Sequence, residues 1–380
     1  MINGSTKSFT SDVLPTALSF AAVGAAVSVL FQQRGGTCGD YPQHFQVFYI
    51  GLFAGLVIGS AIGFLAKREQ LLMARSINTD LIRYFLACVL LFYGIVKVMA
   101  TQFPHMMANM DARFIELNPM RVAWTFFGYS RGYQMFLGWG EMLPAILLLF
   151  RRATLLGAIV ASIVMLNVFF INVFFEVCLK LNSGLYFSLA MFLVLQQAPR
   201  LWKFFISNKE VAAEEPTEMQ PVWLKKSMRV LNWLMVGGIL LWAGEKFYDT
   251  YQYSTRLASL PSVQGAWRVE KVNKWSLGSS RDEGHWIPVE ATDSLCANKL
   301  YFEGSLGVIK NDMIRDRFIL AVDESKKDLT VTFRTANNEY EPDVHWRFDV
   351  KADSLEIWGR WKRDSLNMKC VLRKEKLTLF

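Results

Sequence analysis

Signatures by which soluble enzymes are recognised are scarce in this sequence. Its five cysteines are scattered without a CxxC pair or a cluster at metal-ligand spacing. It has no glycine-rich phosphate loop, nucleophile elbow, HExxH helix or haem-binding pattern. Charged residues are also few, at 19% of the 380 residues. These absences remove support for most named enzyme classes, and they predict no metal site.

Apolar sequence, in contrast, is abundant. The chain is 52% hydrophobic with a positive mean hydropathy, which is too apolar for an ordinary soluble protein. A bilayer core about 30 Å thick needs about 20 apolar residues per helix. The sequence therefore predicts about seven membrane-spanning helices, at 14–31, 46–66, 81–101, 133–150, 153–175, 184–205 and 228–247. A signal peptide is the competing interpretation of the first segment, because a short polar start with Lys7 precedes it.

The distribution of Lys and Arg predicts the orientation. Cations such as Lys67, Arg68, Arg151 and Arg152 crowd the loops of one side and are fewer in the loops of the other. Because cationic loops resist translocation, we expect a cytoplasmic N-terminus in a cytoplasmic (inner) membrane. With seven crossings, everything after about residue 247 then lies outside. The formal charge of +8 follows from this bias and predicts no nucleic-acid partner.

After residue 247 the hydrophobic pattern changes its period. Segments such as 265–274, 317–322, 329–334 and 345–351 alternate apolar and polar residues, with turn-rich stretches between them. This pattern predicts a meandering antiparallel sheet that closes as a small barrel or lipocalin-like domain, because closure removes exposed edges.

Two cysteines, Cys296 and Cys370, fall in this predicted exported domain, where a disulfide is chemically allowed. A second interpretation is that Cys370 is a small core residue, because it shares strand parity with apolar neighbours. Both interpretations stay open at the level of the sequence.

The whole chain then reads as five parts. They are a transmembrane hairpin (1–78), a four-helix membrane domain (79–205), a cytoplasmic linker (206–227), a seventh transmembrane helix (228–247) and an extracytoplasmic β domain (260–380). The aromatic outer loop at 102–132 suits a segment that lies in the membrane interface. A lid over an outward-facing cavity is the less favoured interpretation of that loop.

One face of the second predicted helix carries glycine at every fourth position. These residues are Gly51, Gly55, Gly59 and Gly63. A smooth glycine face lets another helix approach closely. We expect the partner to be the first helix, which offers Gly24 and Ser28 at the same spacing, or a second copy of the chain in a homo-oligomer.

Ionisable residues inside predicted spans are costly and therefore suspect. Lys97 and Glu141 lie in neighbouring predicted helices near their outer ends, where they could meet as an ion pair. Asn167, Asn172 and Glu176 fall at similar heights and could line one polar cavity with them. The alternatives are a purely structural lock between two helices, or side chains that extend to the membrane surface and never meet.

Part of the chain carries the motifs of a known family. Residues 93–97 read Tyr-Gly-Ile-Val-Lys, residues 126–130 read Phe-Phe-Gly-Tyr-Ser, and residues 138–141 read Gly-Trp-Gly-Glu, followed by a leucine run. Together with Arg83, they resemble the motifs of DoxX-like integral membrane proteins over about residues 80–205. Arg83 itself lies near the cytoplasmic end of its predicted helix, which favours an interfacial anchor.

The resemblance implies a four-helix bundle with both ends cytoplasmic, and it makes Gly94, Lys97, Gly138 and Glu141 family motif positions. Some DoxX-like proteins are subunits of thiosulfate:quinone oxidoreductases or associate with membrane redox complexes. This chain departs from the minimal family by a helical hairpin in front and a seventh helix and β domain behind.

Two functions remain in contention. The first is a membrane component of an envelope redox or thiol-handling system, in which Lys97 and Glu141 are catalytic groups that manage the protons of a bound quinone near Asn167. Such a protein would need an envelope redox partner. The second is a non-enzymatic membrane anchor whose β domain binds a lipophilic ligand or an envelope protein. Transport is less favoured, because the sequence lacks an inverted repeat or a broken helix.

Overall fold

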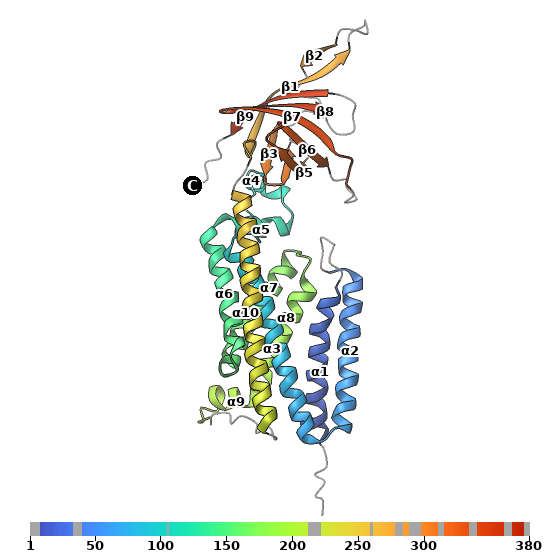
Figure 1. Cartoon of the computed structure of the whole chain (residues 1–380), viewed down its shortest axis with the longest axis vertical. Coiled ribbons are helices and arrows are strands. Elements are labelled where there is room, and N and C mark those ends of the chain that lie inside the picture. The colour runs from blue at the N-terminus through green and yellow to red at the C-terminus, as the bar shows by residue number, and fades with distance from the viewer. Residues whose placement is uncertain are drawn as a thin grey trace, which may run out of the picture. The chain divides into compact units, whose positions relative to one another are not determined.

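The computed structural model describes residues 8–32, 40–104, 106–211, 222–258, 261–277, 284–288, 298–310, 315–333, 340–360 and 367–375. The chain divides into two compact units (Figure 1). The helical unit comprises Met1–Pro104 and Asn118–Tyr251. The barrel unit comprises His105–Leu117 and Gln252–Phe380, so it takes a segment from the loop between two helices.

Ten α-helices and five shorter π or 3-10 segments are described. They are η1 (Phe9–Val13), α1 (Leu14–Ser28), η2 (Val29–Phe31), α2 (Pro42–Leu65), α3 (Arg68–Val98), α4 (Met107–Met110), η3 (Phe114–Glu116), α5 (Pro119–Tyr129), α6 (Arg131–Leu149), η4 (Arg151–Ala153), α7 (Thr154–Phe174), α8 (Lys180–Leu195), α9 (Ala198–Leu201), η5 (Trp202–Ile206) and α10 (Val222–Ala258).

Within the described residues, four helices are long and apolar enough to cross a membrane. They are Phe9–Phe31, Pro42–Leu65, Arg68–Val98 and Arg151–Phe174. The expected count of seven is therefore not supported. The other three expected segments are helical, as α6, α8 and α10, but α8 has only 16 residues and spans about 24 Å. Polar and charged residues lower the mean hydropathy of the other two helices; they include Glu141 in α6 and the Glu245–Lys246 pair in α10.

Two boundaries differ from the predicted ones. The helix α3 begins at Arg68, so the expected domain boundary at 78/79 falls inside a continuous helix. Its start is stabilised by Gln70, whose side chain accepts a hydrogen bond from the Lys67 backbone N–H. The helix α10 runs over Val222–Ala258, well beyond the predicted 228–247, and so absorbs the end of the expected linker. Residues 212–221 of that linker lie outside the described residues.

The glycine face of α2 packs against α1, as predicted. A Cβ added at Gly51 would lie 2.4 Å from the Gly24 carbonyl oxygen, and one at Gly55 would lie 2.3 Å from the Phe20 carbonyl oxygen. At both positions any side chain would collide with the backbone of α1, which explains why glycine stands there. The other members of the face, Gly59 and Gly63, meet α1 and η1 in the same way.

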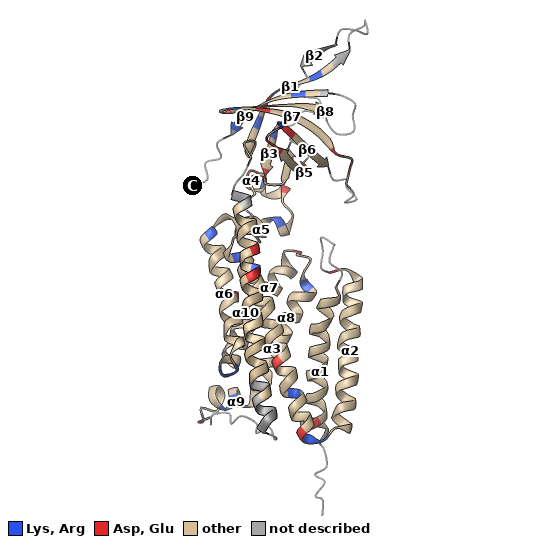
Figure 2. Cartoon of the chain, viewed as in Figure 1, with Lys and Arg blue, Asp and Glu red and all other residues tan. Residues whose placement is uncertain are grey.

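The rest of the helical unit packs around α3. Fully buried residues of α3, α6, α7 and α8, such as Leu90, Leu148, Ala158 and Ala190, form one hydrophobic core. In Figure 2 long stretches of this unit carry no charged residue, among them the whole of α1, α2 and α7, although α3 carries charged residues near its middle. This distribution is typical of helices that cross a bilayer.

The barrel unit is an antiparallel meander. Its strands are β1 (Gly265–Leu277), β2 (Gly284–Pro288), β3 (Lys299–Glu303), β4 (Leu306–Lys310), β5 (Arg315–Asp323), β6 (Asp328–Phe333), β7 (Val344–Lys351), β8 (Ser354–Arg360) and β9 (Asn367–Glu375). Sequential neighbours pair from β3 to β9, and β1 pairs with both β3 and β9, which closes eight strands into a barrel. The predicted closed antiparallel domain is thus confirmed. The short β2 pairs only with the last five residues of β1.

Aromatic side chains fill the barrel. Trp267 and Trp346 are almost fully buried, and the Phe318 ring contacts the rings of Phe302, Phe333 and Trp346 at centroid distances of 6.1, 5.6 and 5.7 Å. A small barrel filled in this way is a packed core. A lipophilic ligand inside it would have to displace these rings.

Of the two interpretations of Cys370, the structure agrees with that of a small core residue. Cys370 is buried in the barrel core and carries a thiol, while Cys296 lies outside the described residues. Cys178, at the turn between α7 and α8, is disulfide-bonded, and its partner lies outside the described residues. The sequence reasoning gave no role to Cys178.

Candidate functional site

An ion pair joins α3 to α6, as predicted. The Lys97 Nζ donates to both carboxylate oxygens of Glu141, at 2.8 and 2.7 Å. Lys97 is 6% exposed and Glu141 is 2% exposed. Two buried charges that meet with this geometry satisfy each other, whereas either one alone would be very costly in an apolar core.

Two glycines bring the helices together at the pair. A Cβ at Gly94 would lie 2.9 Å from the Gly138 carbonyl oxygen, and one at Gly138 would lie 2.7 Å from the Gly94 carbonyl oxygen. The two backbones therefore touch where they cross. Lys97 and Glu141 follow these glycines by three residues each, about one turn along their helices, so the crossing brings the two side chains within reach of each other.

Aromatic groups enclose the ion pair. The Lys97 Nζ lies 5.4 Å from the Tyr93 ring centroid and 6.0 Å from that of Phe103, within the range of cation–π attraction. The Phe103 ring contacts Trp124 of α5 at 5.1 Å. The buried Gln134 of α6 donates to the Phe103 carbonyl oxygen at 3.1 Å, which fixes the turn that carries this ring. The start of the outer loop therefore covers the pair with a hydrogen-bonded aromatic cap.

The three expected cavity-lining residues do not join this pair in one cavity. Asn172 is buried, but its amide donates to the Ser183 hydroxyl at 3.0 Å and to the Leu179 carbonyl at 3.3 Å. It thus joins α7 to α8. Asn167 and Glu176 are exposed. The prediction erred because helix height alone says nothing about the direction in which a side chain points.

A second buried charge cluster lies at the middle of α3, and sequence reasoning missed it. Arg83 is 1% exposed, and its guanidinium lies 3.1 Å from the Asp80 carboxylate. Arg151 binds the other oxygen of Asp80, and Arg83 lies 4.5 Å from the Tyr84 ring centroid. The expected role of Arg83 as an interfacial anchor is therefore wrong. The i, i+3 spacing of Asp80 and Arg83 was the available signal.

The middle of the outer loop belongs to the barrel unit. Lys299 of β3 donates to the Asp111 carboxylate at 2.7 Å, and the Tyr301 hydroxyl binds the same oxygen. Lys310 of β4 donates to the Asp111 carbonyl at 2.7 Å, and the Glu303 carboxylate accepts from the Ala108 backbone N–H at 2.9 Å. This part of the loop was expected in the membrane interface, and it instead packs on the barrel.

These contacts set the protonation of Asp111. Burial of the Asp111 carboxyl acts to raise its pKa. Hydrogen bonds from Lys299 and Tyr301, with the charges of Lys299 and Lys310, outweigh that effect and hold the pKa below the ordinary value. The carboxylate is therefore ionised at neutral pH. A long-range cluster of this kind leaves no signal in a single sequence.

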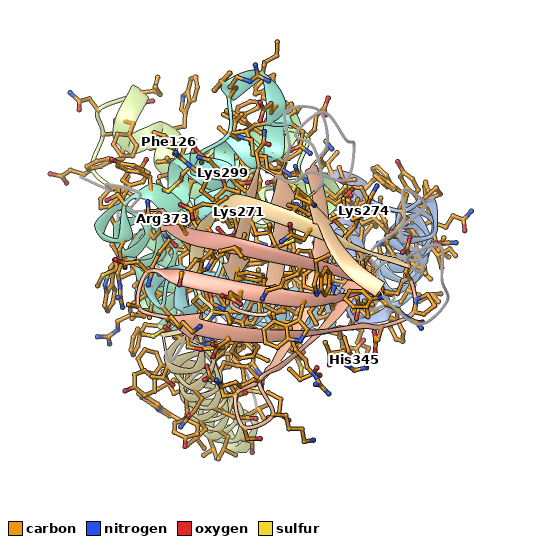
Figure 3. All side chains as sticks on the ribbon, turned by 90° about the horizontal axis from the view of Figure 1, so that it is seen from above. Phe126, Lys271, Lys274, Lys299, His345 and Arg373 are labelled. Atoms are coloured by element: carbon orange, nitrogen blue, oxygen red, sulfur yellow. The ribbon has the colours of Figure 1, made fainter. Side chains whose placement is uncertain are left out.

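The outer face of β1 and β9 carries several cations. Arg268, Lys271, Lys369 and Arg373 point away from the core, as their strand parity with the buried Trp267, Val272, Cys370 and Leu372 requires. Figure 3 labels Lys271 and Arg373 on these strands. Arg268 and Arg373 are direct partners in the ladder. Like charges opposite each other disfavour strand pairing, and the Glu270 carboxylate beside Arg373 offsets part of that cost.

Two acids accompany these cations. The Glu356 carboxylate lies 3.1 Å from Lys369, and the Glu270 carboxylate lies 3.4 Å from Arg373. Among the described side chains of this face, the four cations outnumber these two acids. Among the described residues, no group of three or more His, Cys, Asp or Glu side chains is placed to hold a metal ion.

A comparison with known proteins finds a partial relative. The protein YwoB of Bacillus subtilis (strain 168), described as uncharacterized, is 39% identical to this chain over 95 residues. The match covers 25% of this chain and 60% of YwoB. No family model and no solved structure matches the chain.

Proposed function

We propose that this chain is an integral membrane protein that displays its barrel to bind an anionic component of the cell envelope. The observation that carries this proposal is the cationic face of β1 and β9, where Arg268 and Arg373 stand opposite each other. A cationic face attracts polyanions, and it also repels cationic competitors. The filled interior of the barrel argues that binding takes place on its outside.

The placement of the barrel on the outer side of a cytoplasmic membrane is part of the proposal. It requires that α6, α8 and α10 cross the membrane in addition to the four helices that are long and apolar enough to do so. Large exposed apolar residues support this for α6 and α10, where Phe136, Trp139, Trp233 and Leu241 face outward. Such side chains suit contact with lipid better than contact with water.

A binding experiment tests this function. The full chain in lipid nanodiscs is titrated with inorganic polyphosphate, with neutral dextran as the comparison polymer. We expect saturable polyphosphate binding that weakens with salt, and the double variant Arg268→Gln/Arg373→Gln should weaken it by at least about tenfold. The matched control is Lys326→Gln/Lys351→Gln, which removes two exposed cations, one from the turn after β5 and one from the end of β7. Equal losses in both variants would contradict the proposal.

A second candidate is a role in an envelope redox or quinone-linked system, as the resemblance to DoxX-like proteins implies. Its support is the enclosed Lys97–Glu141 pair, which could take up and release a proton beside a bound quinone. The variant Glu141→Gln should then abolish quinone-linked turnover in membranes. Asp80→Asn breaks the other buried charge cluster and serves as the control. Loss of turnover in both variants, or in neither, would count against a role of Glu141 in proton transfer.

A further inference from the structure

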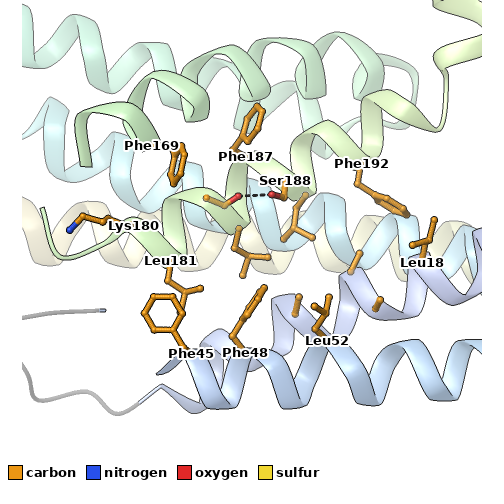
Figure 4. A pocket seen from close by; sticks show the side chains of 16 residues that line it. Leu18, Phe45, Phe48, Leu52, Phe169, Lys180, Leu181, Phe187, Ser188 and Phe192 are labelled. Carbon is orange, nitrogen blue, oxygen red and sulfur yellow. Dashed lines mark hydrogen bonds between the residues drawn. The ribbon is translucent and has the colours of Figure 1, made fainter. Parts of the chain in front are cut away.

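A groove in the helical unit lies between the α1–α2 hairpin and the helices α7 and α8. Its volume is about 710 Å³, within the range of small-molecule sites. Apolar side chains line almost all of it, including Phe45 and Phe48 of α2 and Phe169 of α7. Figure 4 shows these rings around the groove, with Lys180 at one end and Phe192 toward the other.

Hydrogen bonds outside the groove fix its walls. Gln32 after α1 and Asn182 of α8 exchange two side-chain hydrogen bonds, at 2.9 and 3.0 Å. The Asp40 carboxylate accepts from the backbone N–H groups of Lys180 and Leu181, both at 3.0 Å, and so caps the start of α8. The hairpin is thus attached to α8 near the Lys180 end, and the groove between them is preformed.

The dimensions and polarity of the groove indicate its ligand. Along α8 it extends from Lys180 to Phe192, which is about 18 Å at the rise of an α-helix. One leaflet of a bilayer core is about 15 Å thick. The Ser188 hydroxyl, the main polar group within the groove, already donates to the Gly184 carbonyl at 2.7 Å. Along most of the groove the described lining residues are therefore apolar, which suits contact with a long hydrocarbon chain.

Among the described residues that line the groove, Lys180 at its end is the one cation. Its ammonium lies 3.8 Å from Asp40, a carboxylate that is also bound to two backbone N–H groups, and its side chain is 39% exposed. We propose that the groove holds one acyl chain of a membrane phospholipid, whose phosphate binds the Lys180 ammonium. A phosphate there would accept charge-assisted hydrogen bonds from Lys180. The groove would then be a lipid site that links the hairpin to the helices behind it.

Lipid retention tests this proposal. The full chain is extracted in mild detergent, and native mass spectrometry measures the phospholipid that stays bound. We expect about one phospholipid per chain. Ser188→Phe should remove most of it, because position 188 is exposed and a ring there fills the groove. Ile163→Phe is the matched control, because Ile163 is an exposed position of α7 that does not line the groove.

A second variant tests the headgroup. Lys180→Gln keeps the size of the side chain and should lower retention by about tenfold, because the charge-assisted hydrogen bonds to phosphate are lost. Lys209→Gln, which removes an exposed cation elsewhere in the unit, should not change it. Retention that is unchanged in both Ser188→Phe and Lys180→Gln would overturn the proposal. So would a retained molecule without phosphate, such as a quinone.

Discussion

The two units place their polar and apolar residues in opposite ways. In the helical unit Phe136 and Trp139 are 68% and 54% exposed, whereas Lys97 and Glu141 are enclosed. In the barrel unit Trp346 is 1% exposed, while the Arg373 side chain is 72% exposed. The difference teaches that each unit is built for a different solvent. Lipid tolerates outward aromatic rings and makes an outward charge costly, and water reverses both preferences.

The largest effect should come from breaking the enclosed pair of the helical unit. Lys97→Ala leaves the Glu141 carboxylate buried without its partner, which should lower the free energy of unfolding by about 3–5 kcal/mol. Thermal unfolding in detergent measures the loss. The double variant Lys97→Met/Glu141→Leu removes both charges and should recover most of it. If the double variant were as unstable as the single one, the cost would not arise from an unpaired charge.

The same substitution, Trp→Ala, made once in each unit tests the comparison directly. Trp346→Ala opens a cavity in the barrel core and should lower the free energy of unfolding by about 3–5 kcal/mol. Trp139→Ala removes an outward ring of α6 and should change it by less than about 0.5 kcal/mol. Unfolding followed by the remaining tryptophan fluorescence would show both. Similar losses would mean that Trp139 is buried against protein.

The glycine contact between α1 and α2 should give a smaller effect. Gly55→Ala places a Cβ against the Phe20 backbone, and the helices must separate, at a cost of about 1–3 kcal/mol. Gly140→Ala on α6 is the control, because its Cβ would meet nothing within 4 Å. There we expect no loss, since alanine favours helix. A detergent unfolding series that ranks the two variants in the reverse order would exclude close packing at Gly55.

The smallest effect should come from the partly exposed cluster at Asp111. Asp111→Asn removes the charge from contacts that solvent already screens, and it should cost about 1 kcal/mol. The folded-state pKa of Asp111 is lowered, so its stabilisation is complete above the ordinary carboxyl pKa of 3.8. It is lost as the pH falls below that value and through the lowered pKa.

Hydrogen exchange of residues 106–117, measured as a function of pH, follows this contact. In the unmodified chain protection should persist at pH 5 and fall at pH values below 3.8, whereas Asp111→Asn should show weaker protection that does not titrate in this range. Equal pH dependence in both proteins would show that another group holds the loop on the barrel.

Local pattern predicted much of this structure. Apolar windows located the helices, period-two alternation located the strands, and the similar heights of Lys97 and Glu141 in neighbouring predicted helices indicated that the two could form an ion pair. These features depend on residues within a few turns of each other. Helix ends were less predictable, because an exposed charged turn such as that at Arg68 can begin a helix when a capping hydrogen bond stabilises it.

The features that prediction missed all depend on distant contacts. Nothing in a single sequence tells that Asn172 turns toward α8 or that Asp111 meets Lys299, 188 residues later. The enclosed Arg83 was taken for an interfacial anchor because the predicted helix began at residue 81, whereas α3 begins at Arg68. Local sequence therefore predicts the type of each element, whereas the sites depend on contacts between residues that are distant in the sequence.

The loop that packs on the barrel limits how this protein can be divided. Tyr301 of β3 is fully buried although its neighbours in the strand fill the interior, because the segment 106–111 covers it together with Ala266 and Val308. A fragment that begins after α10 would expose this apolar face to water. The residues after α10 therefore do not make up the complete barrel unit, which also includes His105–Leu117. Its surface is completed by residues made long before its first strand, and that early segment can pack only after β1, β3 and β4 have been made.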